Sequence, residues 1–146
     1  GLIDILTEKV IVQKTPILGI CLGIQLFSKK SEEGTLPGLG WLDADTIKFQ
    51  FDGIESHRKI PHMGWNVIKP AQDHHPLLRG FEEDPRFYFV HSYHVKCKNS
   101  EDVLATSSYG IEFTAAVCRG NIMGTQFHPE KSHKFGLQVM KNFVEM

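Results

Sequence analysis

The pattern of apolar and polar positions predicts helical and strand-like segments in alternation over the first part of the chain. Apolar residues with helical spacing favour a helix over residues 4–13, and Pro16 must end it. The short apolar run at 17–21 has the length of a buried strand. Residues 22–27 follow directly and have the pattern of a second helix.

The middle of the chain predicts β-structure, and its end predicts a helix over residues 132–144. Residues 31–40 are rich in glycine and proline and are expected to form a loop, 76–80 a single helical turn, and 119–121 a hairpin turn. No linker divides the sequence, so we expect a single domain of α/β class over 1–146. The predicted strands are 45–51, 64–68, 86–93, 103–107, 113–119 and 121–127.

Composition narrows the function classes. The 146 residues are 41% hydrophobic and 23% charged, with a formal net charge of -1. This balance gives no electrostatic basis for binding nucleic acid or an anionic membrane surface, and the apolar runs are too short to cross a bilayer. Three widely spaced cysteines form neither a disulfide framework nor a zinc pattern, and no signal-peptide pattern is present at the start. We therefore expect a cytoplasmic protein.

The strongest local signal surrounds Cys21, in the segment Gly19-Ile20-Cys21-Leu22-Gly23. A nucleophile on a sharp turn between a buried strand and a helix needs small neighbours two residues away on either side. The helix N-terminus would also favour the reactive thiolate. The alternative is that Cys21 is a small buried hydrophobic residue between two incidental glycines, whereas Cys97 and Cys118 have no comparable setting.

A cysteine nucleophile needs a base, and His128-Pro129-Glu130 is the candidate. Residues two apart on an extended chain face the same side, so Glu130 is expected to hold one imidazole nitrogen of His128. The position beyond an apolar strand fits the location of sites in α/β folds. A solvated turn is the alternative for this segment, and His62 and His91 could either line a pocket or lie in the core.

Together these segments resemble the class I (triad) glutamine amidotransferases, and within them the glutaminase subunits of imidazole glycerol phosphate synthases. Further segments that carry the resemblance are Ser31-Glu32-Glu33-Gly34, Pro61-His62-Met63-Gly64-Trp65-Asn66, Phe89-Val90-His91-Ser92-Tyr93 and Lys131-Ser132. The resemblance implies a flavodoxin-like sheet flanked by helices, with an antiparallel β extension.

The resemblance also implies roles for individual residues. Cys21 would attack the side-chain amide of glutamine, His128 would move protons, Glu130 would orient His128, and the backbone N–H of Leu22 would be an oxyanion donor. A thioester would form, ammonia would leave, and water would release glutamate, with no cofactor or metal. The residues that match glutamine-binding positions are Gln25, Glu33, His91, Ser92 and Tyr93.

A partner subunit is implied as well. In the family, ammonia passes through a tunnel into a (β/α)8-barrel cyclase subunit that makes imidazole glycerol phosphate, a step of histidine biosynthesis. The positions that match this interface or its gate are Trp65, Asn66, Tyr88 and Lys131. Trp65 is a plausible anchor because large aromatic side chains often carry binding energy, and a core tryptophan is the alternative.

The sequence departs from the family in two places. Only 20 residues precede Cys21, so the N-terminal strands and the glycine-rich oxyanion loop are expected to be missing from this chain, leaving an exposed sheet edge. His94 stands where another aromatic residue is expected. The alternatives are a paralogue that supplies ammonia for amidation of bacterial surface sugars, a cysteine peptidase, and an inert partner-binding module.

Overall fold

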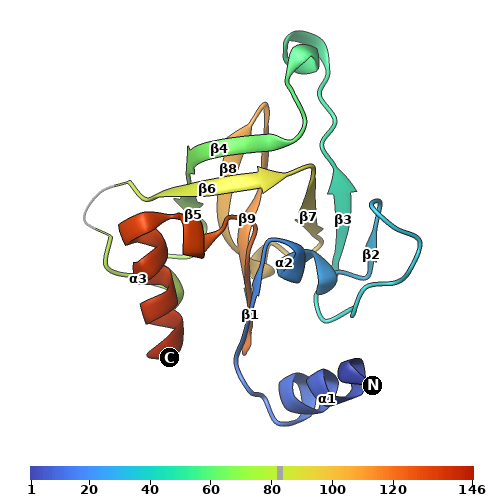
Figure 1. Cartoon of the computed structure of the whole chain (residues 1–146), viewed down its shortest axis with the longest axis vertical. Coiled ribbons are helices and arrows are strands. Elements are labelled where there is room, and N and C mark those ends of the chain that lie inside the picture. The colour runs from blue at the N-terminus through green and yellow to red at the C-terminus, as the bar shows by residue number, and fades with distance from the viewer. Residues whose placement is uncertain (82–83) are drawn as a thin grey trace.

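The largest element of the fold is a five-stranded sheet in the order β1-β10-β9-β8-β5, seen in the computed structural model, which describes residues 1–81 and 84–146 (Figure 1). β1 and β10 are parallel, and the other neighbouring strands are antiparallel. The strands are β1 (Ile17–Ile20), β5 (Lys69–Pro70), β8 (Val103–Tyr109), β9 (Ile111–Arg119) and β10 (Ile122–Thr125).

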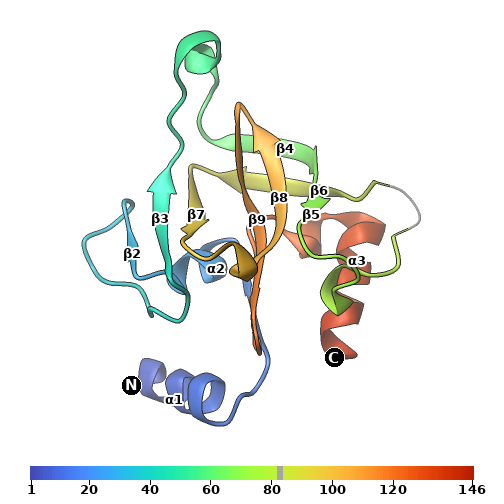
Figure 2. The same ribbon diagram turned by 180° about the vertical axis from the view of Figure 1, so that it is seen from behind.

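Two smaller sheets complete the β-structure. One has the order β2-β3-β7, and the other pairs β4 with β6 antiparallel. Seen from behind, β3 and β7 lie to one side of β8 and β9, and β4 and β6 lie across one end of them (Figure 2). The strands are β2 (Lys30–Ser31), β3 (Ala44–Lys48), β4 (His62–Val67), β6 (Arg86–His91) and β7 (Tyr93–Cys97).

The helices follow the predicted pattern. The first is α1 (Leu2–Thr7), which continues as a π-helical segment over Glu8–Val12, and the second, α2 (Leu22–Leu26), directly follows Cys21. The last is α3 (His133–Val144), and the predicted helical turn at 76–80 is a 3-10 turn over Pro76–Leu78. Further 3-10 turns are Gly53–His57, Ser100–Asp102 and Pro129–Lys131.

The prediction of one continuous strand over 86–93 is wrong. The chain leaves the β4–β6 pair after His91 and enters the sheet with β3 from Tyr93 onward, so Ser92 separates two strands. β7 was not predicted because a polar residue, His94, is buried within it. The predicted loop at 31–40 also begins inside β2, which is only two residues long.

The core consists of two clusters of buried side chains. The larger is rich in aromatic residues and includes Phe87 and Phe127, whose rings stack with centroids 4.0 Å apart. The smaller packs α2 and the Trp41 region against the sheet. Since Phe127 directly precedes His128 and Ile24 lies within α2, both clusters help to fix the segments of the predicted site.

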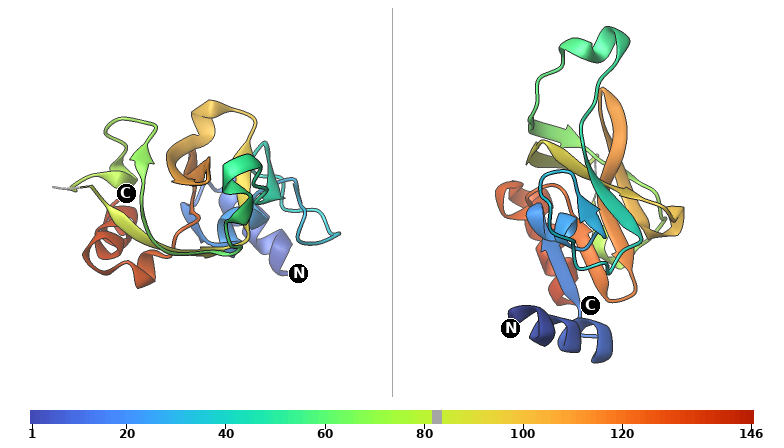
Figure 3. Two further views of the ribbon diagram at one scale, coloured as in Figure 1. Left: turned by 90° about the horizontal axis from the view of Figure 1, so that it is seen from above. Right: turned by 90° about the vertical axis from the view of Figure 1, so that its right-hand side faces the viewer.

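β1, which leads into Cys21, lies at the edge of the five-stranded sheet and has only β10 beside it. No strand of the described residues pairs with its other side, so this edge of the sheet is exposed, as the sequence predicted. Figure 3 shows α1 at the end of β1 that lies away from β4 and β6. None of the helices in the described residues combines the length and apolar character needed to span a bilayer.

Candidate functional site

Cys21 lies on a sharp turn between β1 and α2. Its φ is 51°, a left-handed conformation that L-residues other than glycine seldom adopt. A Cβ added at Gly19 would lie 2.6 Å from the backbone of Gly23 and 2.6 Å from the Phe27 ring, so the glycine there is required. The expectation for Gly23 is wrong, since a Cβ there meets nothing within 4 Å.

Cys21 and His128 follow the same ends of two parallel neighbouring strands. The backbone N–H of Cys21 donates to the carbonyl of Thr125, the last residue of β10, at 2.8 Å. The Cys21 thiol lies 3.9 Å from the Val90 carbonyl, and the His128 N–H donates to the Tyr88 carbonyl at 2.9 Å. Because alternate carbonyls of a strand point the same way, Cys21 and His128 meet the same edge of β6.

His128 is hydrogen-bonded to Glu130. Its Nδ1 lies 2.6 Å from Glu130 Oε1, while its Nε2 is buried and has no hydrogen-bond partner in the described structure. The predicted contact is therefore present, but the expected extended path is wrong. The chain turns at Pro129–Lys131 in a 3-10 turn, and this turn returns the carboxylate to the imidazole.

A cavity of about 380 Å³ opens beside Cys21. It combines the predicted nucleophile, the predicted oxyanion donor and all five predicted glutamine-binding residues, although these come from three separate segments of the chain. Its lining residues are Cys21, Leu22, Gln25, Glu33, Pro61, Val90, His91, Ser92 and Tyr93.

The environment of the Cys21 sulfur disfavours the thiolate in this chain. Burial raises the pKa of the Cys21 thiol above its ordinary value, and the charge of Glu130 adds to this effect. The Leu22 N–H, the Gln126 side chain and the charge of Lys131 act in the opposite direction without reversing the shift. The N–H group at the start of α2 thus favours the thiolate as expected, but burial outweighs it.

His91 lines this cavity and also belongs to a buried network of hydrogen bonds. Its Nδ1 lies 2.8 Å from the Tyr93 carbonyl, which can only accept, so Nδ1 carries the proton. His91 Nε2 then accepts from Nδ1 of His62 at 3.0 Å. Burial lowers the pKa of His62 to about 4 and that of His91 to about 3, so both rings are neutral at pH 7.

Three of the predicted interface residues, Trp65, Asn66 and Tyr88, lie on β4 and β6. The Trp65 side chain is 49% exposed, which excludes the core alternative, and its ring lies 6.1 Å from that of Tyr88. Lys131 is exposed at the end of the His128 turn. Asn66 points the other way along β4, where its amide donates to the Ser108 carbonyl at 2.8 Å and lies 3.4 Å from His62 Nε2.

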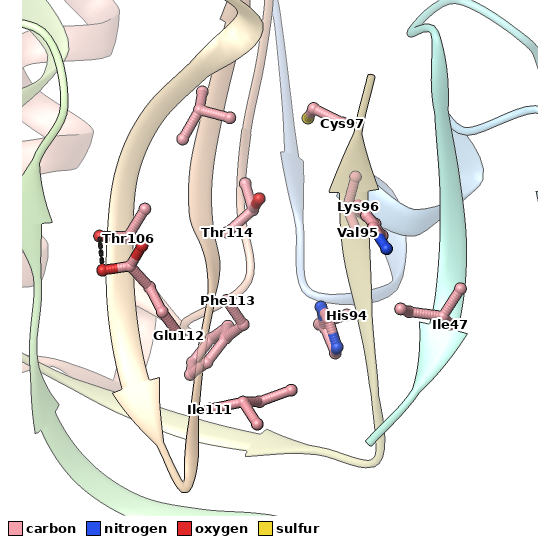
Figure 4. Close-up of a pocket in the computed structure, with 11 residues that line it drawn as sticks. Ile47, His94, Val95, Lys96, Cys97, Thr106, Ile111, Glu112, Phe113 and Thr114 are labelled. Carbon is pink, nitrogen blue, oxygen red and sulfur yellow. Dashed lines mark hydrogen bonds between the residues drawn. The ribbon is translucent and has the colours of Figure 1, made fainter. Parts of the chain in front are cut away.

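A second cavity of about 330 Å³ lies between β7 and the β8–β9 hairpin (Figure 4). His94, where the sequence departs from the family, lines it and is buried with both ring nitrogens unpaired in the described structure. Cys97 also lines it, and burial raises the pKa of this thiol to about 11. None of the predicted site residues lines this cavity.

Gln126 is the residue of this region that the sequence interpretation missed. Its side chain is fully buried, and its Nε2 lies 3.8 Å from Cys21 Sγ. It stands two positions before His128, and residues two apart on a strand share a face. That spacing is the signal that could have identified it.

The fold and this site together define the class of protein. Residues 3–146 match the family described as glutamine amidotransferase class-I, and the chain belongs to that family.

Within the family the chain is HisH-like. It is 53% identical over 146 residues to the imidazole glycerol phosphate synthase subunit HisH 2 of Pseudomonas aeruginosa, covering all of this chain and 70% of that protein. It is 45% identical over 146 residues to the subunit HisH of Leptospira borgpetersenii, with coverage of 100% and 71%. The chain thus spans about 70% of these relatives.

Solved structures agree on the fold. The structure of PurLQS from Thermotoga maritima has a TM-score of 0.72 at 20% identity, covering 98% of this chain and 67% of that one. A glutamine amidotransferase of Thermotoga maritima has a TM-score of 0.60 at 23% identity, with coverage of 96% and 50%.

Proposed function

We propose that the protein is a glutaminase subunit that hydrolyses glutamine to glutamate and ammonia through a Cys21 thioester. The ammonia passes to a (β/α)8-barrel cyclase subunit that makes imidazole glycerol phosphate in histidine biosynthesis. The cavity beside Cys21 carries this proposal, because it combines the nucleophile with every residue that the family resemblance assigns to glutamine binding.

The first chemical step is the transfer of the Cys21 proton to His128. The unpaired Nε2 of His128 accepts it, and Glu130, hydrogen-bonded to Nδ1, stabilises the resulting imidazolium. Sγ then bonds to the side-chain carbonyl carbon of glutamine, and the oxygen takes up the negative charge beside the Leu22 N–H. His128 returns the proton to nitrogen as the C–N bond breaks and ammonia leaves.

Water completes the cycle. His128 removes a proton from a water molecule, whose oxygen attacks the thioester carbon. As the C–S bond breaks and glutamate is released, His128 returns this proton to Sγ and regenerates the Cys21 thiol. Because burial disfavours the free thiolate, the proton transfer is coupled to the arrival of substrate rather than completed beforehand.

Glutamine recognition follows from the charges that line the cavity. The carboxylate of Glu33 is suited to the α-ammonium of glutamine, and the Ser92 and Tyr93 segment supplies polar groups for its α-carboxylate. A peptide substrate fits this arrangement less well, because its flanking residues carry no such pair of opposite charges.

The surface for the barrel partner is the outward face of β4. Met63, Trp65 and Val67 alternate along this strand and are 62%, 49% and 39% exposed. An exposed apolar strip of this kind, with an aromatic residue at its centre, is typical of a protein interface. The Trp65 ring lies 6.1 Å from that of Tyr88, whose carbonyl accepts from the His128 N–H, so this surface is close to the proposed triad.

The test is glutamate release by the full-length protein in complex with the barrel subunit. Cys21→Ala should reduce the rate by at least about a thousandfold, because no other thiol reaches the cavity lining. The matched control is Cys118→Ala, which removes a thiol in β9 and should retain activity. Glutamate release by the Cys21→Ala complex at the rate of the unaltered complex would refute the proposal.

A further inference from the structure

Gln126 stands out among the buried polar residues because its amide is directed at the proposed nucleophile. It directly follows β10, and its backbone N–H donates to the Ala115 carbonyl at 2.8 Å. The side chain is fully buried, and Nε2 lies 3.8 Å from Cys21 Sγ. The family resemblance gives this residue no role in the site.

The orientation of the Gln126 amide is fixed by its neighbours. Nε2 of Gln25 lies 3.0 Å from the Tyr93 carbonyl, and because a carbonyl can only accept, the Gln25 atom there must be the nitrogen. The same nitrogen lies 3.1 Å from Gln126 Oε1. A flipped Gln126 would place two N–H groups against each other, so its oxygen faces Gln25 and its nitrogen faces the sulfur.

The Tyr93 carbonyl, which determines the orientation of both amides, is itself held in place. It accepts a second hydrogen bond from His91 Nδ1 at 2.8 Å, and His91 is held in turn by His62. Both amide hydrogens of Gln25 are therefore used inside the protein, by Tyr93 and Gln126. Only the oxygen of Gln25 remains to accept a hydrogen bond from the substrate.

An N–H group directed at sulfur favours the thiolate over the thiol, because it strengthens as negative charge forms on the acceptor. This matters at Cys21, where burial and the nearby Glu130 both disfavour the charge. The Leu22 backbone N–H is the other hydrogen-bond donor that favours the charged sulfur. Gln126 adds a donor to a site in which the charged nucleophile is otherwise poorly supported.

We propose that Gln126 is a further catalytic residue, whose side-chain amide, held by Gln25, donates a hydrogen bond to the Cys21 thiolate and increases the amount of reactive sulfur. The proposal rests on the proposed role of Cys21 as the nucleophile. Gln126 and His128 are two positions apart, so one short segment supplies both the proposed base and a hydrogen-bond donor to the proposed nucleophile.

The test is the pH dependence of alkylation of each cysteine by iodoacetamide, followed by mass spectrometry on the full-length protein. In Gln126→Met the Cys21 titration should move upward by about 0.4–1 pH unit, so the alkylation rate near neutral pH falls roughly 3- to 10-fold. Gln126→Glu should move it further, because a carboxylate then faces the sulfur. Loss of packing alone would not make the shift of the Cys21 titration larger in Gln126→Glu than in Gln126→Met.

Two controls accompany the variants. Cys97 and Cys118 are read in the same experiment and should keep their titrations. Gln72→Met removes an amide that donates to two carbonyls far from Cys21, at Glu101 and Val103, and should leave the Cys21 titration unchanged. If Gln126→Met does not fold, Gln25→Met removes the anchor of the Gln126 oxygen and should also move the Cys21 titration upward.

The outcomes separate this proposal from the proposed function. An unchanged Cys21 titration in Gln126→Met, or in Gln25→Met where only that variant folds, overturns the proposal. An equal shift of Cys118 overturns it as well. Because the readout does not involve glutamine, a complex that titrates as expected but releases no glutamate would refute the proposed function alone.

Discussion

At the level of single residues, the site depends on a backbone turn that few side chains tolerate. Cys21 has a positive φ and still carries its side chain into the cavity, while Gly19 lets the turn approach α2. Conformations of this kind cost free energy and persist where the surrounding structure enforces them. Here the enforcing contact is the hydrogen bond from the Cys21 N–H to Thr125.

The two glycines of the elbow should respond differently to substitution. Gly19→Ala places a methyl group against the Gly23 backbone and the Phe27 ring, and should lower the free energy of unfolding by about 1–3 kcal/mol. Gly23→Ala, within α2, meets open space and should be neutral or raise it by up to about 1 kcal/mol. Urea denaturation of both variants measures this, and equal losses would contradict it.

The buried imidazoles make stability depend on pH. The pKa values of His62 and His91 are about 4 and about 3 in the fold and 6.5 for an ordinary histidine, so the unfolded chain binds more protons between these values. Their contribution is fully present above pH 6.5 and is lost as the pH falls toward the folded-state values.

The urea concentration at the unfolding midpoint should therefore decrease when the pH is lowered from 7.5 to 5. This decrease should be smaller in His62→Gln than in the unaltered protein. His57→Gln, which replaces an exposed histidine, is the control and should follow the unaltered protein. If the urea midpoint of His62→Gln depends on pH as steeply as that of the unaltered protein, the buried pair is not responsible for the pH dependence.

Local spacing within the sequence was enough to predict the turn at Cys21 and the His128–Glu130 contact, whereas the residues that line the cavity beside Cys21 were expected from the family resemblance. It was not enough for Gln126, because the direction of that amide depends on Gln25 and Tyr93, which lie 101 and 33 positions away. Local spacing could not predict the raised pKa of the Cys21 thiol either, because burial by distant segments is its main cause.

At the level of elements, α3 holds the turn that carries His128 and Glu130. Gly136 of α3 packs directly on the backbone of Pro129, and a Cβ there would collide with the Pro129 carbonyl. The Ser132 hydroxyl joins the same turn to β6, since it donates to the His128 carbonyl at 2.6 Å and accepts from the Tyr88 N–H at 2.9 Å. Helix and strand thus fix the base from two sides.

Gly136→Ala should push α3 away from this turn. We expect a loss of about 1–3 kcal/mol in the free energy of unfolding, together with slower glutamate release by the full-length complex. Leu137→Ala, at an α3 position that is 72% exposed, is the matched control and should change neither quantity appreciably. Normal stability and activity in Gly136→Ala would contradict the packing described.

Elements were predicted well where the apolar pattern is clear, as on one face of α3 and in β9 and β10, where consecutive residues are buried. Short strands such as β2 and β5 have only two residues and no detectable period. The break between β6 and β7 could not be predicted, because it depends on which strands each half pairs with.

At the level of the whole molecule, two exposed surfaces of the described residues bear on the proposed function. One is the free edge of β1, next to the proposed nucleophile, and the other is the apolar face of β4. The second is where we propose that the barrel subunit binds.

Trp65→Ala should weaken association of the full-length protein with the barrel subunit by roughly 30-fold or more, because a central aromatic side chain commonly contributes about 2 kcal/mol or more. Val144→Ala, at an 80% exposed position near the end of α3, is the control. Calorimetric titration measures both, and equal affinity of Trp65→Ala and the unaltered protein would rule out this surface.

The most direct test of the central claim is covalent labelling of the full-length complex by a diazoketone analogue of glutamine, followed by peptide mass spectrometry. The chain has three cysteines, so the position of the adduct is decisive. We expect an adduct on Cys21 alone, and its loss in His128→Asn. An adduct on Cys97 or Cys118, or none on Cys21 in a complex that consumes glutamine, would contradict it.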